Sequence, residues 1–289
     1  MLRVKRSERT VVCTWAVWVI VGLLGFLGLP GCHRDILVPD LEDLVEPGKL
    51  VYDSPDLSAG ALKGRMEEVD DLFAEPRSYA KVLASYELCL QSISPVNQYG
   101  ALWRGARAAS WIGMDPSVPH PLRQRFALNG IAFGRESVKR DSRRVEPFYY
   151  LARSLAALAA SKNEASPKLL REIKARMAIA EALDPTYDAC GPSRFLGRFF
   201  VETDGYPLRY AMGSIDQGLV KLKAASEGCP EYAGNHLTYA RALVEDEQYE
   251  EARVELEKVL TSATPPDRST EHHQWLVAAQ ELLTATRGK

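Results

Sequence analysis

Apolar residues recur at helical spacing along most of this chain, in short blocks separated by polar or proline-containing links. The clearest block covers residues 236–260, where two stretches with apolar positions three or four apart flank the polar run 245–248. Such a short link requires the two helices to pack antiparallel. The small residues Ala240 and Ala252 fall where the two backbones would approach closely. The block therefore predicts a helical hairpin.

Copies of this hairpin precede it in the chain. The second-helix positions Ala252, Leu256 and Val259 recur as small or apolar residues at a shift of 34 residues, which is the tetratricopeptide (TPR) period. In the first helices, a small residue followed by arginine recurs at Ala106-Arg107, Ala152-Arg153, Gly197-Arg198 and Ala240-Arg241. The further helices that we predict cover residues 61–72, 79–90, 101–113, 122–138, 146–160, 168–183, 193–200, 218–225 and 271–286.

These blocks define the fold class. We expect an all-α, TPR-like right-handed solenoid of about five antiparallel helix pairs plus a capping helix. An irregular stretch, 203–213, separates the two helices of the fourth pair and is too long for a plain repeat turn. Insertions of this kind are where functional residues tend to collect.

The first 31 residues differ from the rest and predict export. A basic start precedes a segment without charge from residue 11 to residue 29, which is typical of a signal peptide. The segment ends in Leu29-Pro30-Gly31-Cys32, which resembles a bacterial lipobox and implies cleavage before Cys32 and acylation of that cysteine, palmitate included. The alternative is an uncleaved membrane anchor, because 19 apolar residues nearly span a bilayer. We therefore divide the chain into a lipoprotein signal peptide (1–31), a flexible tether (32–60) and a TPR-like helical domain (61–289).

Lipidation would tie the protein to a membrane in a bacterial cell envelope. His33 and Arg34 follow the cysteine without an aspartate, which resembles the default signal for the outer membrane of a Gram-negative cell. We therefore expect the protein on the periplasmic face of that membrane. The expected mature chain has 32 basic and 37 acidic residues, and this acidity argues against nucleic acid as a partner.

Three cysteines remain after processing at Cys32. Cys190 precedes the first helix of the fourth pair and Cys229 follows its second helix, so antiparallel packing brings both to the same end. Outside the cytoplasm a disulfide can form between them, and the alternative is two buried or unpaired thiols. Cys89 falls inside a predicted second helix and is expected in the core.

The recurring arginines give the chain a candidate binding face. In a TPR first helix, the position after the small packing residue faces the concave side, and the position four residues earlier does as well. The ligand- or partner-binding residues that we predict on this basis are Arg107, Arg153, Arg198, Arg241, Trp103, Tyr149 and Arg194. Guanidinium groups beside aromatic rings suit a carboxylate with an apolar body. The alternative is that each arginine pairs with a glutamate or a helix-end carbonyl of the neighbouring hairpin.

Nothing in the sequence supports catalysis. No nucleophile elbow, phosphate loop or zinc-protease motif is present, and no histidine has a metal-ligand spacing with a second ligand type. Glutamates 250, 251, 255 and 257 are expected to be a solvated helix face. We therefore predict a protein that is not an enzyme and that needs no cofactor or metal.

Taken together, the chain resembles the TPR lipoproteins related to the T component of tripartite ATP-independent periplasmic (TRAP) transporters. The stretches that carry the resemblance are 103–113, 149–159, 182–200, 204–207 and 235–260. It implies an all-helical, periplasm-facing lipoprotein that binds a periplasmic solute-binding protein, an organic ligand or both in its concave groove, and it leaves a homo-oligomer open. The alternative is a TPR scaffold for envelope protein assembly that binds no small molecule.

Overall fold

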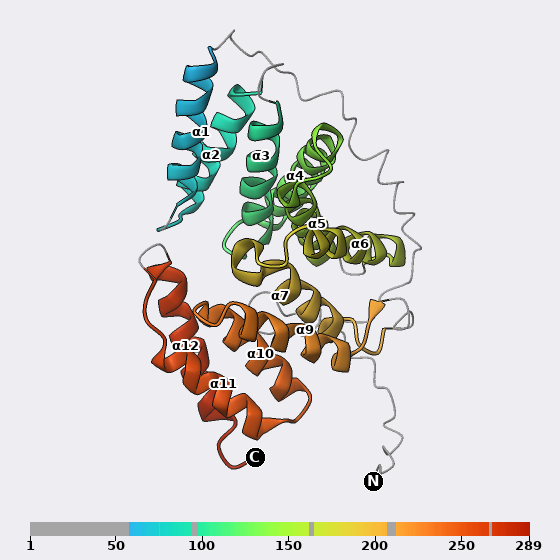
Figure 1. Cartoon of the computed structure of the whole chain (residues 1–289), viewed down its shortest axis with the longest axis vertical. Coiled ribbons are helices and arrows are strands. Elements are labelled where there is room, and N and C mark those ends of the chain that lie inside the picture. Colours follow the sequence, from blue (N-terminus) through green and yellow to red (C-terminus); the bar gives the residue numbers. More distant parts are fainter. Residues whose placement is uncertain (1–57, 75, 94–97, 162–164, 207–211, 266–267) are drawn as a thin grey trace.

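The computed structural model describes residues 58–74, 76–93, 98–161, 165–206, 212–265 and 268–289. The predicted signal peptide, Cys32 and nearly all of the predicted tether lie outside these ranges. Throughout the described residues the regular structure is helical (Figure 1). The helices are α1 (Ala59–Phe73), α2 (Tyr79–Gln91), α3 (Gln98–Met114), α4 (His120–Arg140), α5 (Val145–Ala160), α6 (Pro167–Leu183), α7 (Tyr187–Glu202), α9 (Ile215–Gly228), α10 (Ala233–Glu245), α11 (Tyr249–Thr261) and α12 (Ser269–Ala285).

The helices pack as pairs in chain order, as the hydrophobic pattern predicts. The pairs are α1/α2, α3/α4, α5/α6, α7/α9 and α10/α11, and α12 packs on α10 and α11 at the end. We call α1, α3, α5, α7, α10 and α12 the first helices. Successive first helices also touch, as in α1 with α3, α3 with α5, α7 with α10 and α10 with α12. The pairs change direction along the stack, so that α12 comes back toward the end of the molecule that holds α1 and α2 (Figure 1).

Local sequence signals set several of the helix starts. Serine side chains cap four N-termini by accepting a backbone N–H three residues on, at Ser58, Ser78, Ser166 and Ser214. Because Ser58 is a cap, α1 begins at Ala59, and two residues of the predicted tether are helical. Helix α4 begins at His120, two residues before the predicted start at residue 122, because proline is tolerated in a first helical turn. None of the described helices is both long and apolar enough to cross a membrane.

The core is a chain of apolar clusters between successive pairs. One cluster joins α1–α4, a second α4–α7, a third α7–α11 and a fourth α10–α12. Cys89 is fully buried in the first of them, where burial raises the pKa of its thiol to about 12. Each cluster is shared by neighbouring pairs, so the fold is stabilised by stacking, as in other solenoids.

Helices α7 and α9 cross at two glycines, which gives a test of the packing. Added Cβ atoms would lie 2.6 Å from Leu222 Cγ at Gly197, and 2.6 Å from Val201 Cγ2 at Gly218. We expect Gly218→Ala to lower the free energy of unfolding by about 1–3 kcal/mol, because the Cβ would also lie 2.8 Å from the Gly197 carbonyl oxygen. Urea denaturation measures this change.

The matched control is Gly64→Ala in α1, where nothing lies within 4 Å of the added Cβ. Alanine has the higher helix propensity, so this variant should gain about 0.5–1 kcal/mol. A Gly218→Ala variant as stable as the Gly64→Ala variant would show that α7 and α9 do not cross this closely.

Candidate functional site

Partly buried aromatic rings and guanidinium groups form a continuous run over the first helices. We call this run, with the carboxylates that pair with it, the arginine–aromatic ladder. Its members are Asp70, Phe73, Arg77, Trp103, Arg104, Arg107, Tyr150, Arg153, Tyr187, Asp188, Arg194, Tyr232, Arg268, Glu271 and Trp275. The ladder thus extends from α1 to α12, through each pair in turn.

At its α1 end, the ladder is organised around one carboxylate. Asp70 accepts two hydrogen bonds from Arg104, at 2.9 and 2.8 Å, and one from Arg107 at 2.8 Å. Burial opposes ionisation of Asp70, but the two guanidinium groups outweigh it and lower the pKa of the carboxyl. The Arg107 guanidinium also lies over the Phe73 ring, with its central carbon 4.1 Å from the ring centroid. These contacts join α1 to α3 through polar groups.

The middle of the ladder is aromatic. The Trp103 ring stacks on Tyr150 of α5 at 6.0 Å between centroids and 11° between planes. Tyr150 in turn meets Tyr187 of α7 edge to face, and the Tyr187 hydroxyl donates to the Tyr150 hydroxyl at 3.0 Å. Three first helices are therefore joined by rings that remain partly exposed.

Asp188 is the centre of the ladder. Its carboxylate accepts a 2.6 Å hydrogen bond from the buried Tyr149 hydroxyl and one at 3.2 Å from Arg268. Arg194 and Arg153 lie 3.5 and 3.9 Å from it. Burial would raise the pKa of Asp188, but the charges of Arg194 and Arg153 prevail and lower it. A single carboxylate therefore holds together side chains from α5, α7 and the start of α12.

The backbone that carries Asp188 is a left-handed turn at the start of α7. Residues Asp188, Ala189 and Cys190 have φ values of 50°, 52° and 60°, which residues other than glycine rarely adopt. Arg194 donates to the Ala189 carbonyl at 2.8 Å, and Asn235 of α10 donates to the same oxygen at 3.2 Å. Such strained backbone persists only where its surroundings hold it in place.

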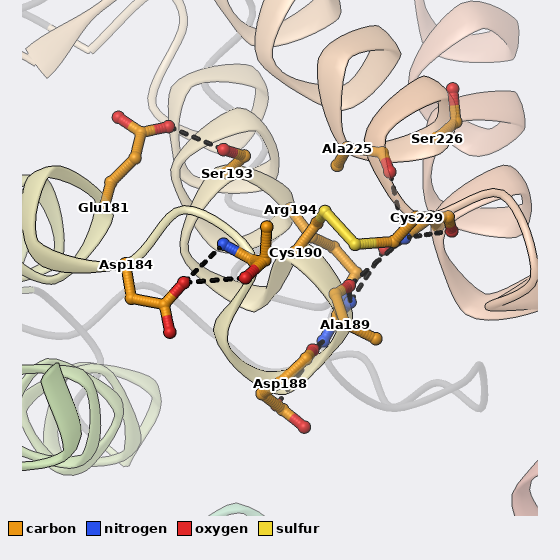
Figure 2. Close-up of a disulfide and its surroundings, with 12 residues drawn as sticks. Glu181, Asp184, Asp188, Ala189, Cys190, Ser193, Arg194, Ala225, Ser226 and Cys229 are labelled. Atoms are coloured by element: carbon orange, nitrogen blue, oxygen red, sulfur yellow. Dashed lines mark hydrogen bonds and ion pairs between the residues drawn. A yellow bond between two sulfur atoms is a disulfide. The ribbon is translucent and has the colours of Figure 1, made fainter.

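A disulfide provides a second constraint on this turn. Cys190 is bonded to Cys229 at the C-terminal end of α9, with an S–S distance of 2.10 Å and 5.9 Å between the Cα atoms. Figure 2 shows this bridge, with Arg194 extending toward the turn and Asp188 beyond it. The bond closes the fourth pair at the end where the sequence places both cysteines.

The ladder continues into α12. The Arg268 guanidinium lies over the Tyr232 ring, with its central carbon 4.8 Å from the ring centroid, and Tyr232 meets Trp275 edge to face at 4.8 Å. Arg194 lies over the same tyrosine at 4.6 Å. Tyr232 is therefore shared by cations from α7 and from the start of α12.

The arginines of the fourth and fifth pairs are arranged differently. Arg198 donates to Glu202 at 2.7 Å and to Glu245 of α10 at 2.5 Å. Arg241 is exposed and makes no hydrogen bond or ion pair within the described ranges. Partial desolvation and the nearby Arg198 charge lower the pKa of Arg241 by more than the charges of Glu245 and Glu281 raise it. Of the four repeated arginines, Arg241 is the one whose guanidinium group is open to a partner.

The structure thus sorts the predicted binding residues into groups. Arg198 pairs with a glutamate of the neighbouring pair, which is the structural pairing that the sequence left open as the alternative. Arg107 and Arg153 also face carboxylates of neighbouring helices, but these belong to aspartates. Arg194 bonds to the turn and to Asn235. Trp103 and Arg241 remain accessible. Within the guanidinium groups of Arg107 and Arg153, the Nε atoms are buried without an acceptor among the described residues.

One predicted residue is placed differently from the expectation. Tyr149 is 1% exposed, so its ring belongs to the core and only its hydroxyl contributes, by holding Asp188. The ring that reaches Trp103 is the next one along, Tyr150. Successive residues of a helix point about 100° apart around its axis. An error of one position in the assumed orientation of α5 therefore exchanges the two tyrosines.

A separate cavity of about 740 Å³ is lined by residues of α9, α10 and α11. Charges of both signs line it, including Lys223, Glu227 and Lys258. At its base, the buried His236 pairs with Glu255 through Nδ1 at 2.6 Å, and its Nε2 lies 3.0 Å from the Pro230 carbonyl oxygen. The described part of the chain holds no group of three or more potential metal ligands.

Antiparallel helix pairs, stacked in chain order and with first helices in contact, define the class: the protein is a TPR-like helical solenoid, as its sequence predicts. It is similar to the crystal structure of a thermophilic TPR protein from Thermus thermophilus, with a TM-score of 0.55 and 17% sequence identity. The match covers 75% of this chain and 100% of the other. No protein-family model and no curated protein matches the sequence. The similarity therefore concerns the fold.

Proposed function

We propose that this chain is a lipid-anchored binding module of the bacterial cell envelope, which holds a protein partner against the arginine–aromatic ladder. The observation that carries the proposal is the unbroken run of partly exposed rings and guanidinium groups from α1 to α12. Tryptophan, tyrosine and arginine dominate the binding energy of protein interfaces far beyond their abundance. Rings that are already fixed by stacking lose little conformational entropy when a partner binds.

The charges of the ladder favour a protein over a small organic acid. Arg104, Arg107 and Arg153 already face internal carboxylates, so a free carboxylate would have to displace Asp70 or Asp188. A protein segment instead covers many rings at once and needs few open donors, such as Arg241. We therefore place the partner's apolar side chains on Trp103 and Tyr150 and an acidic group near Arg241.

Two kinds of partner fit this proposal. The resemblance to the T components of TRAP transporters suggests a periplasmic solute-binding protein, which would link this module to uptake of an organic ligand. The other candidate is a protein of envelope assembly, in which case no small molecule is involved. The proposed leader and Cys32 lipid anchor suit both, since either partner meets the module at a membrane.

We expect Arg241→Glu to reduce capture of the partner about tenfold in a pulldown from envelope fractions, with unchanged thermal stability, because Arg241 makes no hydrogen bond or ion pair with the residues that the structure describes. Arg171→Glu, at an exposed arginine of α6, is the matched control for charge and should capture normally. Mass spectrometry of the bound material separates a solute-binding protein from assembly proteins. Equal capture by both variants would show that Arg241 does not contact the partner.

Membrane attachment is tested separately. Metabolic labelling with a fatty acid should mark the full chain, and Cys32→Ser should abolish the label and release the protein from the membrane fraction, because the thioether that we propose needs this thiol. A labelled Cys32→Ser variant, or an unlabelled wild-type chain, would contradict the lipoprotein assignment.

A further inference from the structure

The two ends of the solenoid are in contact. Arg77, in the link between α1 and α2, donates through Nη1 to Glu271 Oε1 at 2.5 Å, and Glu271 is in the first turn of α12. The contact joins residues 194 positions apart in the chain. In Figure 1 the N-terminal end of α12 lies next to the link that joins α1 to α2. A solenoid ordinarily grows with free ends, because each unit contacts only its neighbours.

This contact is polar, unlike every interface along the stack. Within the described ranges no apolar cluster joins α1 or α2 to α12. Arg77 is held in place from its own side, because its Nε donates to the Phe73 carbonyl at 3.0 Å and its guanidinium lies over the Phe73 ring. The side chains of Arg77 and Glu271 are 16% and 27% exposed. The junction therefore depends on charge, and little apolar area is lost when it separates.

Glu271 is only partly satisfied at this junction. Its Oε2 is buried without a hydrogen bond in the described part of the chain and lies 3.7 Å from Arg268 Nη1. An unsatisfied buried carboxylate oxygen opposes the closed state, since it loses its hydration without a full replacement. Arg268 also bonds to Asp188 at the centre of the ladder. The junction and the ladder therefore share a residue.

The charge of the ladder indicates which kind of ligand separates the Arg77–Glu271 junction. Its cations outnumber its carboxylates six to three, with Arg77, Arg104, Arg107, Arg153, Arg194 and Arg268 against Asp70, Asp188 and Glu271. This excess of positive charge lies on a protein whose sequence is net acidic. An acidic segment with apolar side chains complements both the guanidinium groups and the rings, and it competes directly with Glu271 for Arg77 and Arg268.

We propose that the solenoid is a ring closed by the Arg77–Glu271 pair, and that an acidic, apolar segment of a partner opens the ring at this pair to reach the ladder. The gating half of this inference rests on the function proposed above. In the closed ring Glu271 pairs with Arg77 and lies 3.7 Å from Arg268, and displacement of Glu271 lets the incoming carboxylates take its place beside these two guanidinium groups. Closure of the ring and binding of the partner segment use the same side chains, so the two equilibria are coupled.

Distances between the two ends test the ring. Cysteines replacing the exposed Ala80 in α2 and Thr270 in α12 accept spin labels, whereas Cys89 is buried and Cys190 and Cys229 are bonded. We expect a single short distance in the otherwise unchanged chain and a longer, broader distribution with Arg77→Glu or Glu271→Gln. The charge swap Arg77→Glu with Glu271→Arg should restore the short distance. The ring would be overturned if the distance between the labels is unchanged in the single variants, or if it remains long in the charge-swapped variant.

Binding of a defined probe tests the gating. A fluorescein-labelled peptide of alternating glutamate and leucine should bind Glu271→Gln about tenfold more tightly than the unchanged chain. Glu67→Gln removes the same charge from an exposed position of α1 and should not change the affinity. Equal affinities for Glu271→Gln and the unchanged chain would overturn the gating while the distances still report on the ring. A peptide that binds no variant would overturn both the gating and the proposed binding face.

Discussion

Replacing Asp188 with asparagine should lower the free energy of unfolding by about 3–5 kcal/mol at about pH 7, the range for removing one partner of a buried charge pair. Asparagine keeps the shape of the side chain and tolerates the left-handed backbone, so the change isolates the charge. Arg153, Arg194 and Arg268 would then lose the carboxylate around which all three gather. Chemical denaturation followed by circular dichroism measures the loss.

The pH dependence of this loss has a definite sign. The folded-state pKa of Asp188 is below its ordinary value of about 3.9, so its contribution is complete above that value and disappears as the pH falls through the folded pKa. The difference in stability between the wild-type chain and Asp188→Asn should therefore be constant near neutral pH and should shrink below about pH 4. Asp70 titrates in the same direction and contributes to the acid sensitivity that remains in the variant.

Asp184→Asn provides the matched control, four positions earlier. Asp184 accepts hydrogen bonds from the backbone and hydroxyl of Thr186, which an asparagine oxygen can also accept. We expect this variant to change the free energy of unfolding by no more than about 0.5 kcal/mol. If Asp188→Asn is no more destabilised than this control, the ladder does not depend on its central carboxylate.

The sequence could predict those features of the fold and of the site that are local or that join neighbouring helices. Helix pairs follow from periodicity, because burying one stripe of each helix requires apolar residues three or four apart. The repeated arginines follow as well, because each has the same position relative to a small packing residue in its own helix. The shared end of Cys190 and Cys229 needs only antiparallel packing. These features are local or arise from neighbouring elements.

No sequence pattern indicated that Asp188 would be the centre of the ladder. The positive φ at Asp188 depends on Asn235, Arg194 and a disulfide to another helix, and none of the residues that adopt positive φ in this turn is a glycine that would predict it. Asp70 and Glu245, which pair with the repeated arginines, lie on other helices at positions without a common register. The Arg77–Glu271 pair depends on the summed curvature of the whole stack. Contacts between distant elements require the three-dimensional arrangement.

Removing the disulfide is the second change with a large expected effect. The Cys190–Cys229 bond closes a loop with a sequence separation of 39 residues, and the chain-entropy account assigns about 4 kcal/mol to a loop of this length. We therefore expect Cys190→Ala with Cys229→Ala to lose about 2–5 kcal/mol of stability. The loss has a local part as well, because the left-handed turn at Asp188 would lose one of its constraints.

A reductant separates the bond from the side chains. Dithiothreitol should lower the unfolding midpoint of the wild-type chain in urea to near that of the double-alanine variant, and it should not change the midpoint of the variant itself. Cys89 is buried and unpaired in both proteins, so it cannot account for a difference. A wild-type chain that reductant leaves unchanged would mean that the bond is absent in solution. A stability loss that reductant reproduces would instead tie the geometry of the ladder to an oxidising compartment, which is where the proposed export would take this protein.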